Sequence, residues 1–195
     1  RTVERGSLAD VCLSITLGQL QHRQDRDDHA VATLTRAYRT STALDMSRQR
    51  VLAAAALANV VSGLGDLPQA LALNQEVIDW DTENKAWLDL SVTRFLRGQI
   101  HQRMRDYANA IAELREARRI SVHLKDRQGI AFADLRLCQA QIELANWSEA
   151  QKHCDNAFEI FKEAESNDML KEAQALMARI DLNQGRAAEA LATLN

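Results

Sequence analysis

The sequence predicts an all-α protein, and three observations carry that prediction. The chain has 195 residues with only one proline and seven glycines, which is too few for a turn-rich β-sandwich or a collagen-like chain. Hydrophobic residues make up 46% of the chain and charged residues 26%, so a buried core is expected rather than disorder. Small residues recur every forty residues, which is typical of stacked helical units.

The repeat is defined by alanines that stand forty residues apart, at Ala30, Ala70, Ala110, Ala150 and Ala190. Another small residue stands twelve residues before each alanine, at Gly18, Ala58, Gly98, Cys138 and Ala178. Two helices approach each other closely only where their side chains are small. We therefore expect each forty-residue unit to be a pair of antiparallel helices that cross at these positions.

The first helix of each unit is predicted by apolar residues at steps of four and three. Such triplets occur as Leu13, Leu17 and Leu20, as Ala53, Leu57 and Val60, and as Ala133, Leu137 and Ala140. Steps of three and four place residues on one face of a helix. We expect each triplet to lie in the core.

The second helix of each unit follows a short polar turn. In the first unit, this helix is expected to begin near residue 29. Three carboxylates precede it, Asp25, Asp27 and Asp28, and negative charges stabilise a helix N-terminus through the helix dipole. Pro68 suits a first helical turn because its missing N–H has no partner there. The expected helices, in order, cover 5–23, 29–44, 48–63, 68–80, 85–104, 107–124, 127–145, 148–165, 168–184 and 187–195.

Composition and missing motifs exclude several classes of function. A net charge of −3 argues against a direct nucleic-acid binder, and no apolar run reaches the roughly 18 residues of a membrane span. The five histidines are scattered without a metal-binding pair, and no P-loop, GxSxG or GxGxxG motif is present. We expect no cofactor, no metal and no catalytic residues in this segment.

The three cysteines, Cys12, Cys138 and Cys154, lack CxxC spacing and are odd in number. This pattern favours a reducing compartment such as the cytoplasm and leaves a periplasmic location open. Cys138 and Cys154 fall on facing helices of one expected hairpin. A redox pair is one interpretation of them, and small apolar side chains that fill a tight contact are the favoured one.

The repeat resembles the tetratricopeptide repeat (TPR). The residues that carry the resemblance are Leu57, Ala58, Gly65, Asp66, Leu67, Ala70 and Val77, echoed by Gly98, Asp106, Tyr107, Ala110 and Ala117. The sequence departs from the family in its forty-residue unit, in the absence of a closing proline, and in Arg97, which replaces a leucine. The resemblance implies a TPR-like α-solenoid, a right-handed superhelix of about five antiparallel helical hairpins.

The resemblance also implies a working surface, because the first helices of a TPR superhelix line its concave groove. The residues after the small crossing residues then form a column that we call the amide column: Gln19, Asn59, Gln99, Gln139 and Arg179. Beside it we expect apolar anchors at Phe95, Phe132 and Leu135. Amides both donate and accept hydrogen bonds, so they suit the backbone of an extended peptide.

The expected organisation is one TPR-like repeat domain over 1–195, with units at 5–44, 45–84, 85–124, 125–164 and a truncated 165–195. The start at Arg1 and the end in an apolar helical pattern suggest a piece of a longer chain. We expect a protein-binding or peptide-binding scaffold or sensory module of a bacterial signalling or regulatory protein. The alternative is the regulatory segment of a signalling enzyme, such as a diguanylate cyclase or a kinase, whose catalytic domain lies outside this chain.

Overall fold

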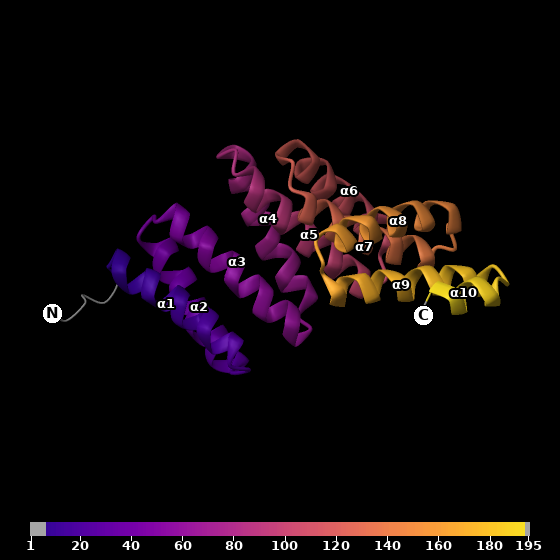
Figure 1. The fold of residues 1–195 in the computed structure, drawn as a ribbon. Coiled ribbons are helices and arrows are strands. Elements are labelled where there is room, and N and C mark those ends of the chain that lie inside the picture. Colours follow the sequence, from indigo (N-terminus) through magenta and orange to yellow (C-terminus); the bar gives the residue numbers. More distant parts are fainter. Residues whose placement is uncertain (1–6, 194–195) are drawn as a thin grey trace. The chain divides into compact units, whose positions relative to one another are not determined.

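The computed structural model describes residues 7–193, and in that range the chain forms ten α-helices and no strand (Figure 1). The helices are α1 (Leu8–Arg23), α2 (Asp27–Ala43), α3 (Ser47–Leu64), α4 (Leu67–Glu83), α5 (Trp87–Arg103), α6 (Tyr107–Leu124), α7 (Arg127–Glu143), α8 (Trp147–Glu163), α9 (Asn167–Asn183) and α10 (Ala187–Thr193). All ten predicted helices are present, and 107–124 matches α6 at both ends. Residues 5–6 and 194–195 of the predicted helices lie outside the described residues.

Consecutive helices pack as antiparallel pairs, and the pairs fall into two compact units. One unit ends at Ala86 and contains the hairpins α1–α2 and α3–α4. The other begins at Trp87 and contains the hairpins α5–α6, α7–α8 and α9–α10. Within each unit, the first helix of a hairpin also packs on the hairpin before it. The described residues thus form a TPR-like solenoid, as the sequence predicts.

The small residues of the repeat lie at the helix crossings, as predicted. Ala30, Ala70, Ala110 and Ala150 are each 0% exposed. A Cβ atom added to Gly98 would lie 2.7 Å from Cγ of Leu114, which is shorter than any normal contact. The crossing distance is therefore set by the smallest side chains of the repeat.

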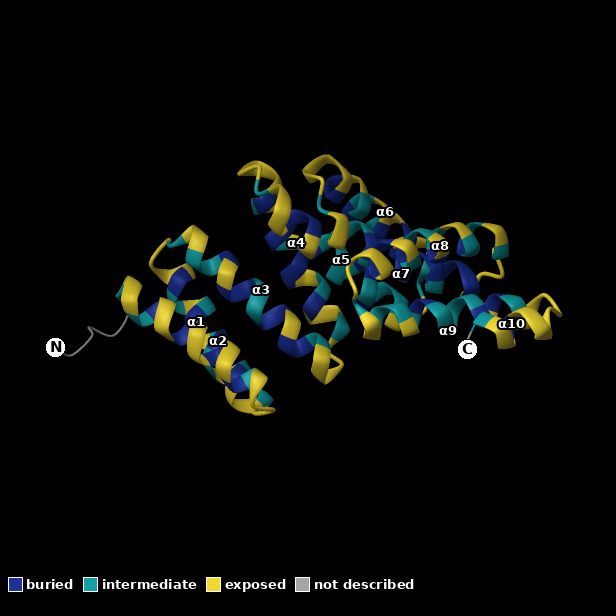
Figure 2. Ribbon diagram, viewed as in Figure 1, coloured by how far each residue is buried: buried dark blue, intermediate teal, exposed yellow. Residues whose placement is uncertain are grey.

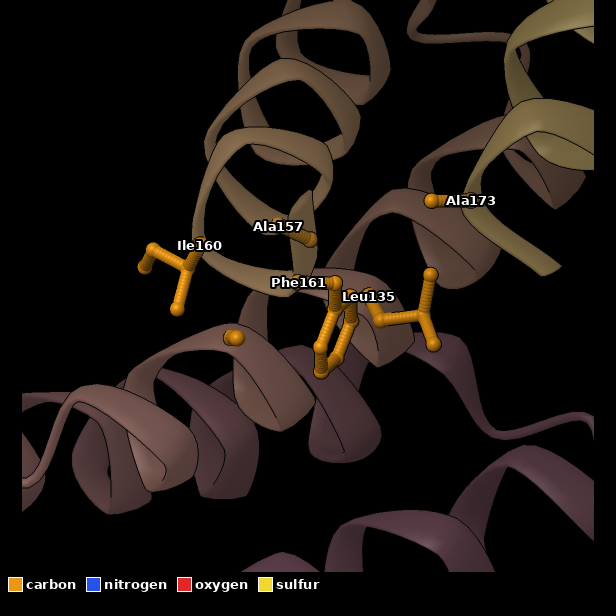
Figure 3. Packing of buried hydrophobic residues seen from close by; sticks show 6 residues of the cluster. Leu135, Ala157, Ile160, Phe161 and Ala173 are labelled. Atoms are coloured by element: carbon orange, nitrogen blue, oxygen red, sulfur yellow. The ribbon is translucent and has the colours of Figure 1, made fainter. Parts of the chain in front are cut away.

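The core of the second unit is clearest where α7, α8 and α9 meet. Leu135, Ala157, Ile160, Phe161 and Ala173 form a buried cluster there (Figure 3). Phe161 is 1% exposed and is among the largest fully buried side chains. The three helices are thus held together around one aromatic ring.

The turns between helices follow a period of twenty residues that the sequence did not reveal. One residue of each turn has a left-handed backbone: Asp25, Asp45, Gly65, Lys85, Arg105, Lys125, Ala145, Glu165 and Gly185. The next N–H bonds back to a carbonyl five residues earlier, for example Asp106 N to His101 O at 2.9 Å. This bond belongs to the Schellman ending of a helix. Identical turns explain why the hairpins repeat so regularly although only two of the nine residues are glycine.

The prediction that Leu13, Leu17 and Leu20 lie in the core is wrong. These side chains are 60%, 45% and 48% exposed, whereas the equivalent triplets of α3 and α7 are buried. The core side of α1 is formed instead by residues such as Val11 and Ile15. In α3 and α7 the triplet packs on the preceding hairpin, and no described residue takes that place beside α1.

We expect Ala110→Leu to lower the free energy of unfolding by about 1–3 kcal/mol, because it overpacks a crossing with no spare space. Denaturant titration followed by circular dichroism measures the change. Ala112→Leu is the matched control, since Ala112 is exposed on the same helix. Equal stabilities of the two variants would contradict the assignment of Ala110 to a tight crossing.

Candidate functional site

The second unit brings together four of the predicted groove residues on the helices α5 and α7. Gln99 and Gln139 line one cavity of about 440 Å³, and Phe95 and Phe132 line another of about 310 Å³. The smaller cavity, lined by Phe95 and Phe132, lies at the N-terminal halves of α5 and α7. The larger cavity, lined by Gln99 and Gln139, lies at their C-terminal halves. We call the two cavities together the α5–α7 groove.

The larger cavity of the α5–α7 groove is lined by polar and basic side chains. Its lining consists of Gln99, Gln102, Arg103, Arg136 and Gln139. Gln102 Nε2 donates a hydrogen bond of 2.9 Å to the backbone oxygen of Arg136, which ties α5 to α7. Arg136 Nη1 donates to Gln139 Oε1 at 3.2 Å. The bond fixes the orientation of the Gln139 amide, whose nitrogen can then donate to a ligand.

The electrostatics of this cavity are moderated by a carboxylate. Arg136 Nη1 also forms an ion pair of 2.7 Å with Glu172 Oε1 on α9. Both side chains are partly exposed, at 24% and 34%, so the pair is screened by solvent and contributes little to stability. The pair holds the guanidinium of this cavity-lining arginine between Gln139 and Glu172.

The smaller cavity is largely apolar. Val92, Phe95, Leu96 and Phe132 contribute to its lining. The rings of Phe95 and Phe132 lie 6.4 Å apart, and the ring of Phe132 lies 5.5 Å from that of Phe161 in an edge-to-face arrangement. Phe132 is therefore only partly exposed and is supported from behind by the core. A rigid aromatic wall of this kind suits an apolar side chain of a ligand.

The other predicted groove residues lie elsewhere. Gln19 and Asn59 are exposed on α1 and α3 of the first unit. Arg179 on α9 forms an ion pair of 2.8 Å with Glu143. Leu135 was predicted to face the groove, but it is 0% exposed and packs in the cluster around Phe161. It is a core residue and is not accessible to a ligand.

Three residues of the polar cavity were missed by the sequence analysis: Gln102, Arg103 and Arg136. Each lies three or four residues from Gln99 or Gln139 on the same helix. Neighbours at this spacing share a helix face. The sequence could therefore have identified these three residues. They lie one helical turn before or after the glutamines of the amide column.

Cys138 and Cys154 are joined by a disulfide bond between α7 and α8, with their Cα atoms 5.4 Å apart. Both side chains are 0% exposed and fill the contact between the two helices, as the favoured interpretation expects, but they do so as a bonded pair. Cys12 is a free cysteine and is exposed. Within residues 7–193, no group of three or more His, Cys, Asp or Glu side chains is arranged to hold a metal ion.

None of the helices in the described range is long and apolar enough to cross a membrane. No protein-family model matches the sequence, and no curated protein matches it either. The fold of the chain, in contrast, is found among solved structures.

Three solved structures show how widely this fold is shared. The apo form of RapI superposes with a TM-score of 0.88 at 14% identity, over 94% of this chain and 67% of RapI. Aspartyl phosphate phosphatase F from Bacillus subtilis has a TM-score of 0.84 at 13% identity, over 95% of this chain and 49% of that one. A kinesin light chain protein of Podospora anserina, built of nearly identical TPR-like repeats, has a TM-score of 0.80 at 14% identity over 98% and 94%.

These likenesses extend over nearly the whole chain, and identities of 13–14% make them evidence about the fold. They agree with the forty-residue register, the hairpins and the buried crossing residues. The chain therefore has a TPR-like helical repeat fold.

Proposed function

We propose that the α5–α7 groove binds an extended segment of a partner protein or a peptide, and that the chain acts as a scaffold or sensory module. The observation that carries this proposal is the placement of an apolar cavity and an amide-lined cavity end to end along the same two helices. A peptide needs both, because it presents side chains and backbone polar groups in alternation.

The residues of the groove have separate roles in this proposal. Phe95 and Phe132 hold an apolar side chain, and burial of that side chain supplies the larger share of the affinity. Gln99 and Gln139 bond the ligand backbone and fix its register. Arg136 holds the Gln139 amide in position through its hydrogen bond to Gln139 Oε1.

The comparisons support a binding role in bacterial signalling or regulation. A Rap protein of similar fold, with a TM-score of 0.77 at 15% identity, was crystallised in complex with the competence and sporulation factor. This chain covers 52% of that protein, so we extend only the binding role to it. In this proposal residues 1–195 form one repeat domain without catalytic activity of its own.

We expect the double variant Gln99→Ala/Gln139→Ala to bind its partner about 1–3 kcal/mol more weakly, because hydrogen bonds desolvated in the complex would be lost. The partner is first captured from the native host with the full chain as bait. It is then titrated against the wild type and the variant by calorimetry, with a melting curve for each protein.

The matched control is Gln69→Ala/Gln151→Ala, which removes two amides from α4 and α8. It is expected to leave the affinity unchanged. Unchanged affinity of the Gln99→Ala/Gln139→Ala variant, with an intact fold, would contradict the groove as the binding site.

A further inference from the structure

The smaller cavity of the α5–α7 groove has a mostly apolar wall that contains one charged residue. Asp126, which directly precedes α7, is the single ionisable residue among the described residues that line this cavity. No lysine, arginine or histidine of the described range belongs to the lining. The fixed charge in the wall is therefore that of a carboxylate.

The two oxygens of the Asp126 carboxylate have different surroundings. Oδ1 accepts the backbone N–H of Gly129 at 3.0 Å and so caps α7. A Cβ atom added at position 129 would collide with Asp126 Oδ2, so the glycine leaves room for this oxygen beside the α7 backbone. Oδ2 accepts no hydrogen bond from the residues that the structure describes. One oxygen is thus committed to the helix, and the other is available to a ligand.

The hydroxyl group that lines the same cavity can only accept a hydrogen bond from a ligand. Ser91 Oγ donates to the backbone oxygen of Ala117 at 3.1 Å and lies 2.9 Å from Ser121 Oγ. Because Ser91 has one hydroxyl hydrogen, Ser121 must be the donor of the second bond. Gln128 is the other polar side chain of the lining and is exposed. We call Ser91 and Asp126 the acceptor end of the cavity.

We propose that the smaller cavity takes a lysine side chain of the bound peptide, an inference that rests on the groove being the peptide site. Lysine has a flexible four-carbon stem that ends in a cation with three N–H donors and no acceptor. The stem packs against Phe95 and Phe132, and the ammonium group donates to the acceptor end. Aromatic faces also attract a cation. The cavity of about 310 Å³ has room for the whole side chain.

An acidic side chain does not suit this cavity, although a helix N-terminus commonly attracts anions. The carboxylate of Asp126 already occupies the N-terminus of α7 and repels a second one. The basic residues on either side of it lie outside the lining. Arg127 pairs with Glu163, and Lys125 is exposed in the turn before α7. The turns between helices are exposed in Figure 2.

The single available carboxylate oxygen favours lysine over arginine. A guanidinium binds a carboxylate best through two parallel hydrogen bonds, which require both oxygens. Oδ1 of Asp126 is already used by the N–H of Gly129. A compact ammonium group needs one oxygen only.

The first test asks which peptides the chain selects. Random peptides displayed on phage are selected against the immobilised wild-type chain. We expect the enriched sequences to share a lysine and to bind more weakly to the Gln99→Ala/Gln139→Ala variant. Enriched peptides that need these glutamines but share no lysine would overturn this inference and leave the groove proposal intact. Selection of no peptide that needs the glutamines would overturn both.

The second test removes the two charges one at a time. An enriched peptide is made with its lysine and with norleucine, which keeps the stem and lacks the ammonium group. Asp126→Asn removes the negative charge and keeps the cap, because an asparagine oxygen can accept the same N–H of Gly129. Calorimetry should show that the wild type binds the lysine peptide about tenfold more tightly than the norleucine peptide. The Asp126→Asn variant should bind the two peptides equally.

Asp66→Asn is the matched control for the loss of a capping charge. Asp66 caps α4 in the first unit, where its Oδ1 accepts the backbone N–H of Gln69 at 3.1 Å. This variant should prefer the lysine peptide as the wild type does, and melting curves check that all three proteins fold. A lysine preference that survives Asp126→Asn, or that Asp66→Asn removes equally, would overturn the role assigned to Asp126.

Discussion

Replacing Phe161 by alanine is expected to lower the free energy of unfolding by about 3–5 kcal/mol. The ring is 1% exposed and lies in the cluster that joins α7, α8 and α9 (Figure 3). Truncation removes its buried area and leaves a cavity that the three helices cannot fill. Denaturant titration of the variant and the wild type measures the loss.

The change is also expected to reach the α5–α7 groove. Phe132 rests edge-to-face on Phe161 with 5.5 Å between the ring centres, so the wall of the apolar cavity loses its support. Partner binding should therefore weaken although Phe161 does not touch the ligand.

Phe158→Ala is the matched control, because Phe158 lies on the same helix and is only partly buried. We expect a smaller loss of stability and unchanged binding for this variant. Equal effects of the two phenylalanine variants would contradict the central role assigned to Phe161.

Reduction of the disulfide between Cys138 and Cys154 is expected to lower the free energy of unfolding by about 3 kcal/mol. The bond closes a loop between residues 16 positions apart, and opening it restores conformational freedom to the unfolded chain. Unfolding curves recorded with and without a strong reductant measure the difference.

Two variants test whether the loss of stability under reductant comes from this disulfide. Cys12→Ser should respond to the reductant like the wild type, because Cys12 takes no part in the bond. Cys138→Ala/Cys154→Ala should not respond. A wild type whose stability is unaffected by reductant would contradict the contribution assigned to this disulfide.

The sequence by itself determined the helices and the way they pair. Alanines such as Ala30 and Ala110, at one offset in every unit, identify the crossings because only small side chains allow such close backbones. The same register placed Gln99 and Gln139 on equivalent faces of α5 and α7. The two amides meet in one cavity because consecutive hairpins repeat the same geometry.

The tertiary structure decided which of these faces are covered. Periodicity states which residues share a face, but exposure depends on what packs there. Leu135 was predicted to face a ligand and is buried because α8 and α9 close over it. Leu13 was predicted to be buried and is exposed because no described helix packs on that side of α1.

Only the tertiary structure showed the buried polar cluster around Asp134. This carboxylate is 0% exposed, and its Oδ1 accepts hydrogen bonds from Arg118 Nε at 2.8 Å and His153 Nδ1 at 2.6 Å. Asn156 bonds to Oδ2. The partners come from α6 and α8 and are 16 to 22 residues away in sequence. A buried charge must be paired to be tolerated, and no local pattern in the sequence reveals partners that only packing brings together.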